Sequence, residues 1–238
     1  MTTQPMETTG TLGIAPAPRN DADWRRSAEA WGDRYRANPS DPEAAINFAQ
    51  ALRGMGQRAQ AAAVLEQSSI QNPKHTGIAG AYGRALADTG NYKQALEVLN
   101  RAHAPDQPDW RILSVQGAVL DQMGRHDEAQ RYYATALKIV PDEPSVLSNL
   151  GLSYALSKNL VRAEITLRKA VSRPGAEPRV RQNLALVVGL QGRFAEAETI
   201  ARADLPPDLA AANVAYLQQM LAQQNQIRLP ASSKAGRS

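Results

Sequence analysis

The stretch Asp109–Asp142 reads DWRILSVQGAVLDQMGRHDEAQRYYATALKIVPD, and its pattern recurs along the chain in both directions at an interval of 34 residues. One column of this pattern holds a small residue in every copy: Ala49, Gly83, Gly117, Gly151 and Ala185. A second column holds alanine in every copy: Ala61, Ala95, Ala129, Ala163 and Ala197. The chain is therefore an array of five repeats.

A 34-residue interval with a small residue at repeat position 8, alanine at 20 and proline near 32 is the pattern of the tetratricopeptide repeat, a helix-turn-helix unit. The two small columns fall where the helices of one unit cross, so a larger side chain would push the backbones apart. At position 15, glycine supplies the left-handed residue that ends the first helix, and Lys158 interrupts this column. The five repeats are expected at 42–75, 76–109, 110–143, 144–177 and 178–211.

Both ends of the array are expected to carry a cap helix, because a solenoid must close its exposed ends. The sequence predicts a flexible linker over 1–22, an N-terminal cap helix within 23–41, a C-terminal cap helix over 208–225 and a disordered tail over 226–238. Trp24 and Trp31 should lie on the first repeat, and Asp208 should cap the last helix. One side of that helix is expected to be apolar: Leu209, Val214, Tyr216, Leu217, Met220 and Leu221. The predicted fold is an all-α, right-handed α-solenoid.

Composition agrees with a helical array. The 238 residues are 43% hydrophobic but only 5% aromatic, which suits alanine-rich helix pairs. The absence of cysteine excludes disulfides, thiolate nucleophiles and cysteine-ligated zinc. A net charge of +4 from 27 basic and 23 acidic residues is nearly balanced, so no nucleic-acid partner is implied.

No enzyme is indicated by the sequence. The segment Gly54–Ala59 satisfies G-x-G-x-x-A, but it follows a helix instead of a strand, and its Gly56 belongs to the position-15 column. Ser153 lies mid-helix without the second glycine of a nucleophile elbow. His126 shares its column with Tyr92, Leu160 and Phe194, which makes it a packing residue. We expect no catalytic residue, no cofactor and no metal.

A concave groove is the expected binding surface, because the first helix of every unit lines the inside of such a superhelix. Arginines are predicted to lie in its front half, at Arg53, Arg84 and Arg111. Apolar anchors are predicted in its rear half, at Leu152 and Leu186. Asn149 and Asn183 stand beside these positions and either contact a ligand or bond the neighbouring helix. A solvated surface with no ligand is the alternative.

Repeat proteins that capture the C-terminal carboxylate of chaperones resemble this array, and they use lysine at position 5 with asparagine at position 9. Here position 5 holds Ile46, Gly80, Ser114, Ser148 and Gln182. That clamp is therefore absent.

A more specific resemblance rests on whole segments of the chain. These are AWGDRYRANP at 30–39, PDWRIL at 108–113, PSVLSNLGLSYALS at 144–157, QNLALVVGLQGRF at 182–194 and ANVAYL at 212–217. Together they resemble the TadD family of tight-adherence (Flp) pilus assembly proteins over about residues 27–222. The resemblance implies a bacterial outer-membrane lipoprotein that faces the periplasm and helps to assemble the secretin pore.

Members of that family usually begin with a lipoprotein signal and a lipidated cysteine, and this sequence holds neither. We expect the periplasmic face of the outer membrane if a signal and a lipidated cysteine precede Met1, and the cytoplasm otherwise. The expected partner is the secretin or another protein of the pilus machinery. The alternative is a general cytoplasmic adaptor or co-chaperone that binds peptide segments in its groove. Neither function needs a cofactor, a metal or nucleic acid.

Overall fold

A computed structural model describes residues 21–102 and 108–228, and this part of the chain consists of twelve α-helices without a strand. The N-terminal cap helix and the first helices of the five repeats are α1 (Asp21–Ala37), α2 (Pro42–Gly54), α4 (Thr76–Asp88), α6 (Trp110–Gln122), α8 (Pro144–Leu156) and α10 (Pro178–Leu190). The second helices and the last helix are α3 (Arg58–Gln71), α5 (Tyr92–Arg101), α7 (His126–Ile139), α9 (Leu160–Val171), α11 (Phe194–Ala201) and α12 (Pro207–Arg228).

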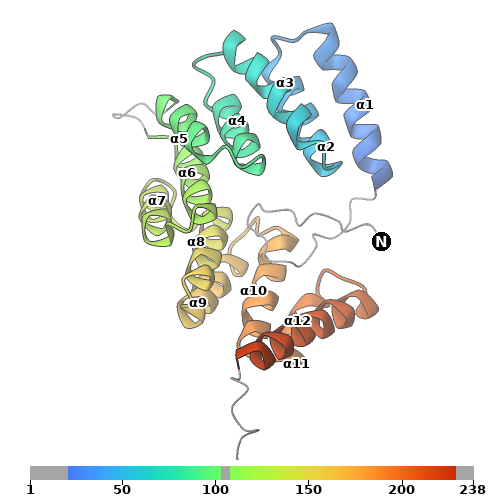
Figure 1. The fold of residues 1–238 in the computed structure, drawn as a ribbon, viewed down its shortest axis with the longest axis vertical. Helices are drawn as coiled ribbons and strands as arrows, with labels where there is room; N and C mark the ends of the chain where they lie inside the picture. Colours follow the sequence, from blue (N-terminus) through green and yellow to red (C-terminus); the bar gives the residue numbers. More distant parts are fainter. Residues whose placement is uncertain (1–20, 103–107, 229–238) are drawn as a thin grey trace, which may run out of the picture.

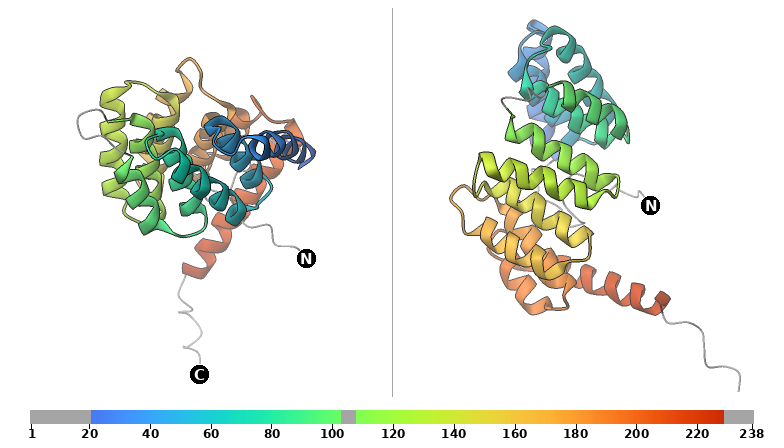
Figure 2. Two further views of the ribbon diagram at one scale, coloured as in Figure 1. Left: turned by 90° about the horizontal axis from the view of Figure 1, so that it is seen from above. Right: turned by 90° about the vertical axis from the view of Figure 1, so that its left-hand side faces the viewer.

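The helix pairs stack in chain order into a curved array (Figures 1 and 2). Each first helix contacts the first helix of the next repeat, in the series α2, α4, α6, α8 and α10. Among the described residues, the second helices α3, α5, α7 and α9 make no such contact with one another. Neighbouring units are therefore closer along the first helices, which places these helices on the concave side. The predicted α-solenoid is confirmed.

The start of most first helices is fixed by a side chain that accepts a backbone N–H. The Asp41 carboxylate accepts from Glu43 N at 2.9 Å, and the Asp109 carboxylate accepts from Arg111 N at 2.8 Å. In repeat 2 a histidine caps the helix: Nδ1 of His75 accepts a hydrogen bond from Ile78 N at 3.2 Å. These bonds satisfy N–H groups that have no partner within the helix.

The small-residue columns lie at the helix crossings, as predicted. A Cβ atom placed on Gly83 would be 2.6 Å from Cγ of Leu99, and one on Gly117 would be 2.6 Å from Cε1 of Tyr133. The alanine column is buried throughout, from Ala61 to Ala197. The two helices of each unit therefore approach so closely that only small residues fit between them.

Left-handed residues end the first helices. Four glycines of the position-15 column have φ between 75° and 82°: Gly56, Gly90, Gly124 and Gly192. Lys158 adopts the same conformation with φ 65°, although a side chain disfavours it. The same left-handed turn therefore forms in repeat 4, which has Lys158 in place of glycine.

The N-terminal cap helix α1 packs on α2, as expected. Trp24 covers Gly54 so closely that a Cβ there would lie 2.4 Å from the indole ring. The rings of Tyr35 and Phe48 are 5.9 Å apart at their centroids. Helix α1 begins at Asp21, and the part of the predicted linker before it lies outside the described residues.

The C-terminal helix α12 packs on α10 and α11 and then extends past them (Figure 2). It begins at Pro207, so Asp208 lies within its first turn and does not precede it as a cap. The predicted apolar side is only partly correct, because Leu209, Tyr216 and Met220 are exposed. Val214 is buried as predicted, together with Ala210, and Leu217 packs against Gly189 of α10. The helix continues to Arg228, and the rest of the predicted tail lies outside the described residues.

Candidate peptide-binding groove

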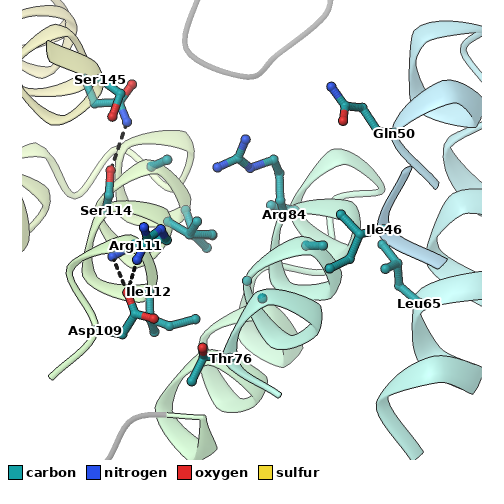
Figure 3. Close-up of a pocket in the computed structure, with 18 of the residues that line it drawn as sticks. Ile46, Gln50, Leu65, Thr76, Arg84, Asp109, Arg111, Ile112, Ser114 and Ser145 are labelled. Atoms are coloured by element: carbon teal, nitrogen blue, oxygen red, sulfur yellow. Dashed lines mark hydrogen bonds and ion pairs between the residues drawn. The ribbon is translucent and has the colours of Figure 1, made fainter. Parts of the chain in front are cut away.

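A pocket of about 410 Å³ opens on the concave side of the first three repeats (Figure 3). Its walls come mainly from α2, α4 and α6, and residues from the first two turns of α8 and the first turn of α10 complete it. Its charged and larger polar lining residues are Gln50, Arg53, Arg84, Asp109, Arg111, Gln122, Asn149 and Arg179. Three of the predicted groove arginines thus share one pocket.

Three of the four lining arginines have a carboxylate partner. Nε of Arg53 lies 2.5 Å from Oδ2 of Asp88, which belongs to the next repeat and is largely buried. The Arg111 guanidinium lies 3.9 Å from Asp109 and 4.5 Å above the Trp110 ring. Nε of Arg179 lies 2.8 Å from Oε2 of Glu177.

Arg84 differs from these three. Within residues 21–102 and 108–228, no carboxylate forms an ion pair with it. Its side chain projects from α4 into the space between the α2 and α6 walls (Figure 3). Desolvation by the surrounding walls, followed by the positive charges of Arg53 and Arg179, lowers the pKa of Arg84 to about 10. The guanidinium reaches solvent and stays protonated at neutral pH, so the pocket holds an unbalanced positive charge.

Small and apolar residues form the rest of the pocket. Gly77 and Gly80 lie on the α4 wall, and Ile46 and Ile112 lie on either side of it. A Cβ atom on Gly80 would meet a single described neighbour, Cδ1 of Ile112 at 3.4 Å, which is an ordinary contact. The wall at Gly80 is therefore open, and the backbone of a bound chain could approach it closely.

The predicted apolar anchors of the rear half do not line this pocket. Leu152 is 3% exposed and Leu186 is 4% exposed, so both belong to the packed interior. Gln50 and Arg84 occupy the same repeat position in repeats 1 and 2 and are exposed. The prediction of exposed leucine anchors is therefore wrong. At this repeat position the side chains on α8 and α10 are buried, whereas those on α2 and α4 are exposed to solvent.

The two asparagines bond the neighbouring helix, which was one of the two alternatives. Nδ2 of Asn149 donates to Oγ of Ser114 at 3.1 Å, and Nδ2 of Asn183 donates to Oγ of Ser148 at 2.9 Å. Asn183 is 4% exposed. Asn149 is half-buried and also lines the pocket.

A buried carboxylate joins repeats 3 and 4 in a way that the sequence analysis missed. Oδ1 of Asp121 accepts a hydrogen bond from Ser153 Oγ at 2.8 Å and lies 2.9 Å from Nδ1 of His126, while Tyr133 OH donates to Oδ2 at 3.0 Å. Burial raises the pKa of the Asp121 carboxyl, and the three hydrogen bonds lower it in part.

These residue types resemble a catalytic triad, but their arrangement does not. Ser153 and His126 both reach the same oxygen of Asp121, and Ser153 is 0% exposed. A substrate could not reach the Ser153 hydroxyl. The cluster therefore fixes the packing of two repeats.

Among the described residues, no three of histidine, cysteine, aspartate and glutamate are grouped as metal ligands would be. No helix in the described part of the chain combines the length and the apolar character that a membrane span requires.

Arg179 also lines the pocket, although it was not among the three arginines predicted for the groove. It belongs to repeat 5, three repeats beyond Arg84, yet both line one pocket. Repeat position showed that Arg179 is on a first helix and near the concave side. The curvature that brings it to Arg84 depends on many small packing angles and has no local signal.

Family models support the assignment of tetratricopeptide repeats. Two models described as Tetratricopeptide repeat match residues 115–179 and 178–203. A model described as Anaphase-promoting complex, cyclosome, subunit 3 matches residues 25–102. No curated protein matches the sequence.

Solved structures share the fold at low sequence identity. A tetratricopeptide repeat protein from Parabacteroides merdae ATCC 43184 is 13% identical with a TM-score of 0.69, over 84% of this chain and 80% of its own. PilW, described as a widely conserved type IV pilus biogenesis factor, is 17% identical with a TM-score of 0.62, over 81% of this chain and 91% of its own. The human IFIT1 dimer with PPP-AAAA is 15% identical with a TM-score of 0.65, over 86% of this chain and 52% of its own.

At these identities the structural matches establish the fold alone. Together with the repeat models and the helix crossings, they define this chain as a tetratricopeptide-repeat protein. Such a fold is typical of a non-enzymatic scaffold that binds other proteins.

Proposed function

We propose that this chain is a scaffold of the tight-adherence (Flp) pilus assembly system and that it binds a protein of that system in the concave pocket. The observation that carries the binding role is the pocket itself, which is open, lined by several repeats and positively charged at Arg84. An arginine without an ion pair, in an open pocket that several repeats line, supports a ligand-binding role.

The pilus role rests on the residue segments that resemble the TadD family, which include loops and cap helices as well as repeat positions. The likeness to PilW agrees with this proposal at the level of fold. The proposed partner is the secretin subunit or another component of the machinery. A pore subunit that awaits insertion exposes strand edges, and a groove that covers such a segment would prevent aggregation.

In this proposal the protein works at the periplasmic face of the outer membrane. Expression of the complete gene in its native cells, followed by membrane fractionation, tests that location. Recovery with the outer membrane is expected, and recovery in the cytosol would favour the adaptor alternative.

Deletion of the gene in the native cells tests the function. We expect fewer assembled pili and fewer secretin multimers, with rescue by the wild-type gene. A Gly80→Leu gene should fail to rescue, because the new side chain would fill the open wall of the pocket. Ala63→Leu is the matched control, since Ala63 is exposed on α3 and lies outside the pocket. Normal pili after deletion would overturn the pilus proposal.

A further inference from the structure

The chemistry of the pocket narrows the kind of segment that it can bind. Its charged lining residues are four arginines, from repeats 1, 2, 3 and 5, and one aspartate. Asp88, Asp109 and Glu177 partly neutralise three of the arginines. Among the described residues, no carboxylate forms an ion pair with Arg84. A ligand that completes this arrangement must supply an anionic group.

The environment of Arg84 adds a second reason. The positive charges of Arg53 and Arg179 disfavour the positive charge of Arg84, and Asp88 offsets this effect only in part. A carboxylate between these three groups would turn repulsion into attraction. The charge arrangement of the site therefore favours an anionic ligand.

The apolar part of the pocket favours a peptide over a nucleic acid. Trp110 is the aromatic residue among those that line the pocket, and the Arg111 guanidinium already covers its ring at 4.5 Å. Single-stranded nucleic acids are usually bound by several exposed aromatic rings in a groove of continuous positive charge. Ile46 and the open wall at Gly80 suit instead an aliphatic side chain and a closely approaching backbone.

We infer that the pocket binds a short extended peptide segment in which an aspartate or glutamate side chain stands next to an aliphatic residue. The carboxylate contacts Arg84, with Arg53 and Arg179 beside it. The aliphatic side chain lies against Ile46, and its backbone passes over Gly80. A volume of about 410 Å³ accommodates only a few side chains, so the recognised segment is short. This inference rests on the proposed groove-binding function and adds the chemistry of the partner.

The test begins with the full-length protein and a phage-displayed library of random dodecapeptides. We expect enrichment of sequences that place aspartate or glutamate beside leucine, isoleucine or valine. One selected peptide is then synthesised in two forms, with the acidic residue kept or replaced by its amide, and both are titrated calorimetrically. The amide form should bind at least about tenfold more weakly, because a hydrogen-bonded charge pair is lost.

Arg84→Gln should weaken binding of the acidic peptide by a similar factor and should remove the difference between the two peptide forms. Arg131→Gln is the matched control, since Arg131 is exposed on α7 and does not line the pocket. It should leave the affinity unchanged. Equal melting temperatures of the variants would show that the fold is intact.

Four results would overturn the inference. One is selection of peptides that show no preference for acidic residues. If Gly80→Leu nevertheless abolished binding of these peptides, the groove-binding function would still be supported. Another is an unchanged preference for the acidic form in Arg84→Gln. The third is tighter binding of a 5′-triphosphorylated oligoadenylate than of any selected peptide. If no peptide binds at all, both the inference and the groove-binding function fail.

Discussion

The side chain of Asn183 donates a hydrogen bond of 2.9 Å to the hydroxyl of Ser148, 35 residues earlier in the preceding repeat. Both residues are 4% exposed. Asn149 and Ser114 make the equivalent bond one repeat earlier. Buried polar side chains of successive first helices therefore hold these repeats in register.

Replacing Asn183 with alanine should lower the free energy of unfolding by about 1–3 kcal/mol, because the buried Ser148 hydroxyl would lose this partner. Ser148→Ala should cost a similar amount. The double variant should lose less than the two single losses added together, since each change removes the same bond. Urea unfolding measures all three. Strictly additive losses would contradict the role of this pair.

Two glycines of α4 provide a matched comparison. Gly83→Ala should destabilise the protein by about 1–3 kcal/mol, because its Cβ would lie 2.6 Å from Leu99 Cγ. Gly80→Ala should instead raise stability by about 0.5–1 kcal/mol, since its Cβ meets an ordinary contact and alanine favours the helix. Thermal unfolding distinguishes the two. Equal shifts would show that the assignment of crossing and groove positions is wrong.

The left-handed turn at Lys158 is strained relative to its glycine counterparts. Lys158→Gly should raise the free energy of unfolding by about 0.5–1 kcal/mol, because glycine adopts φ 65° without steric cost. Gly124→Ala, the reverse change at φ 75°, should lower it by about 1 kcal/mol. A destabilised Lys158→Gly variant would instead mean that the lysine side chain contributes an interaction of its own.

Glu164 makes stability depend on pH. Burial alone would raise its pKa, but hydrogen bonds from Gln191, Arg168 and Arg193 lower the pKa to about 2, from an ordinary value of 4.5. A lowered folded-state pKa contributes stability above pH 4.5, and this contribution is lost as the pH falls from 4.5 towards 2.

Glu164→Gln should therefore cost about 1–2 kcal/mol at pH 7, a modest value because both arginines are partly exposed to solvent. The difference from wild type should shrink as the pH falls below 4.5. Urea unfolding at several pH values measures it, with Glu29→Gln on the exposed side of α1 as the control. A difference that does not change between pH 7 and pH 3 would contradict the assignment.

The sequence predicted the repeats well because the deciding constraints are local. A residue at a helix crossing must be small, and a residue that ends a helix in the left-handed region is preferably glycine. The structural roles of Gly83 and Gly124 could therefore be predicted from residue type and spacing. The groove was predicted less completely. Repeat position gave the direction of Arg84 but could not show that Leu186, at the same position in repeat 5, is closed off. It also could not show how curvature brings Arg179 to Arg84.

The C-terminal helix shows the same limit. Leu209 and Tyr216 were assigned to its packed side by their hydrophobicity, yet both are exposed. The face of a last helix that packs depends on the shape of the surface that the preceding repeat presents to it. Here Gly189 of α10 leaves room for Leu217, and this fixes the rotation of α12.

Site-specific photo-crosslinking tests the central claim most directly, which is that the concave pocket holds a protein of the pilus machinery. A photo-crosslinking amino acid in place of Gln50, an exposed residue that lines the pocket, would leave the open wall at Gly80 free. The same amino acid in place of Arg131 would stand on α7 outside the pocket. In native cells, the proposal predicts a crosslink from position 50 to the secretin or another pilus-assembly protein and none from position 131. Crosslinks to that machinery from position 131 alone, or crosslinks from position 50 to unrelated proteins alone, would contradict it.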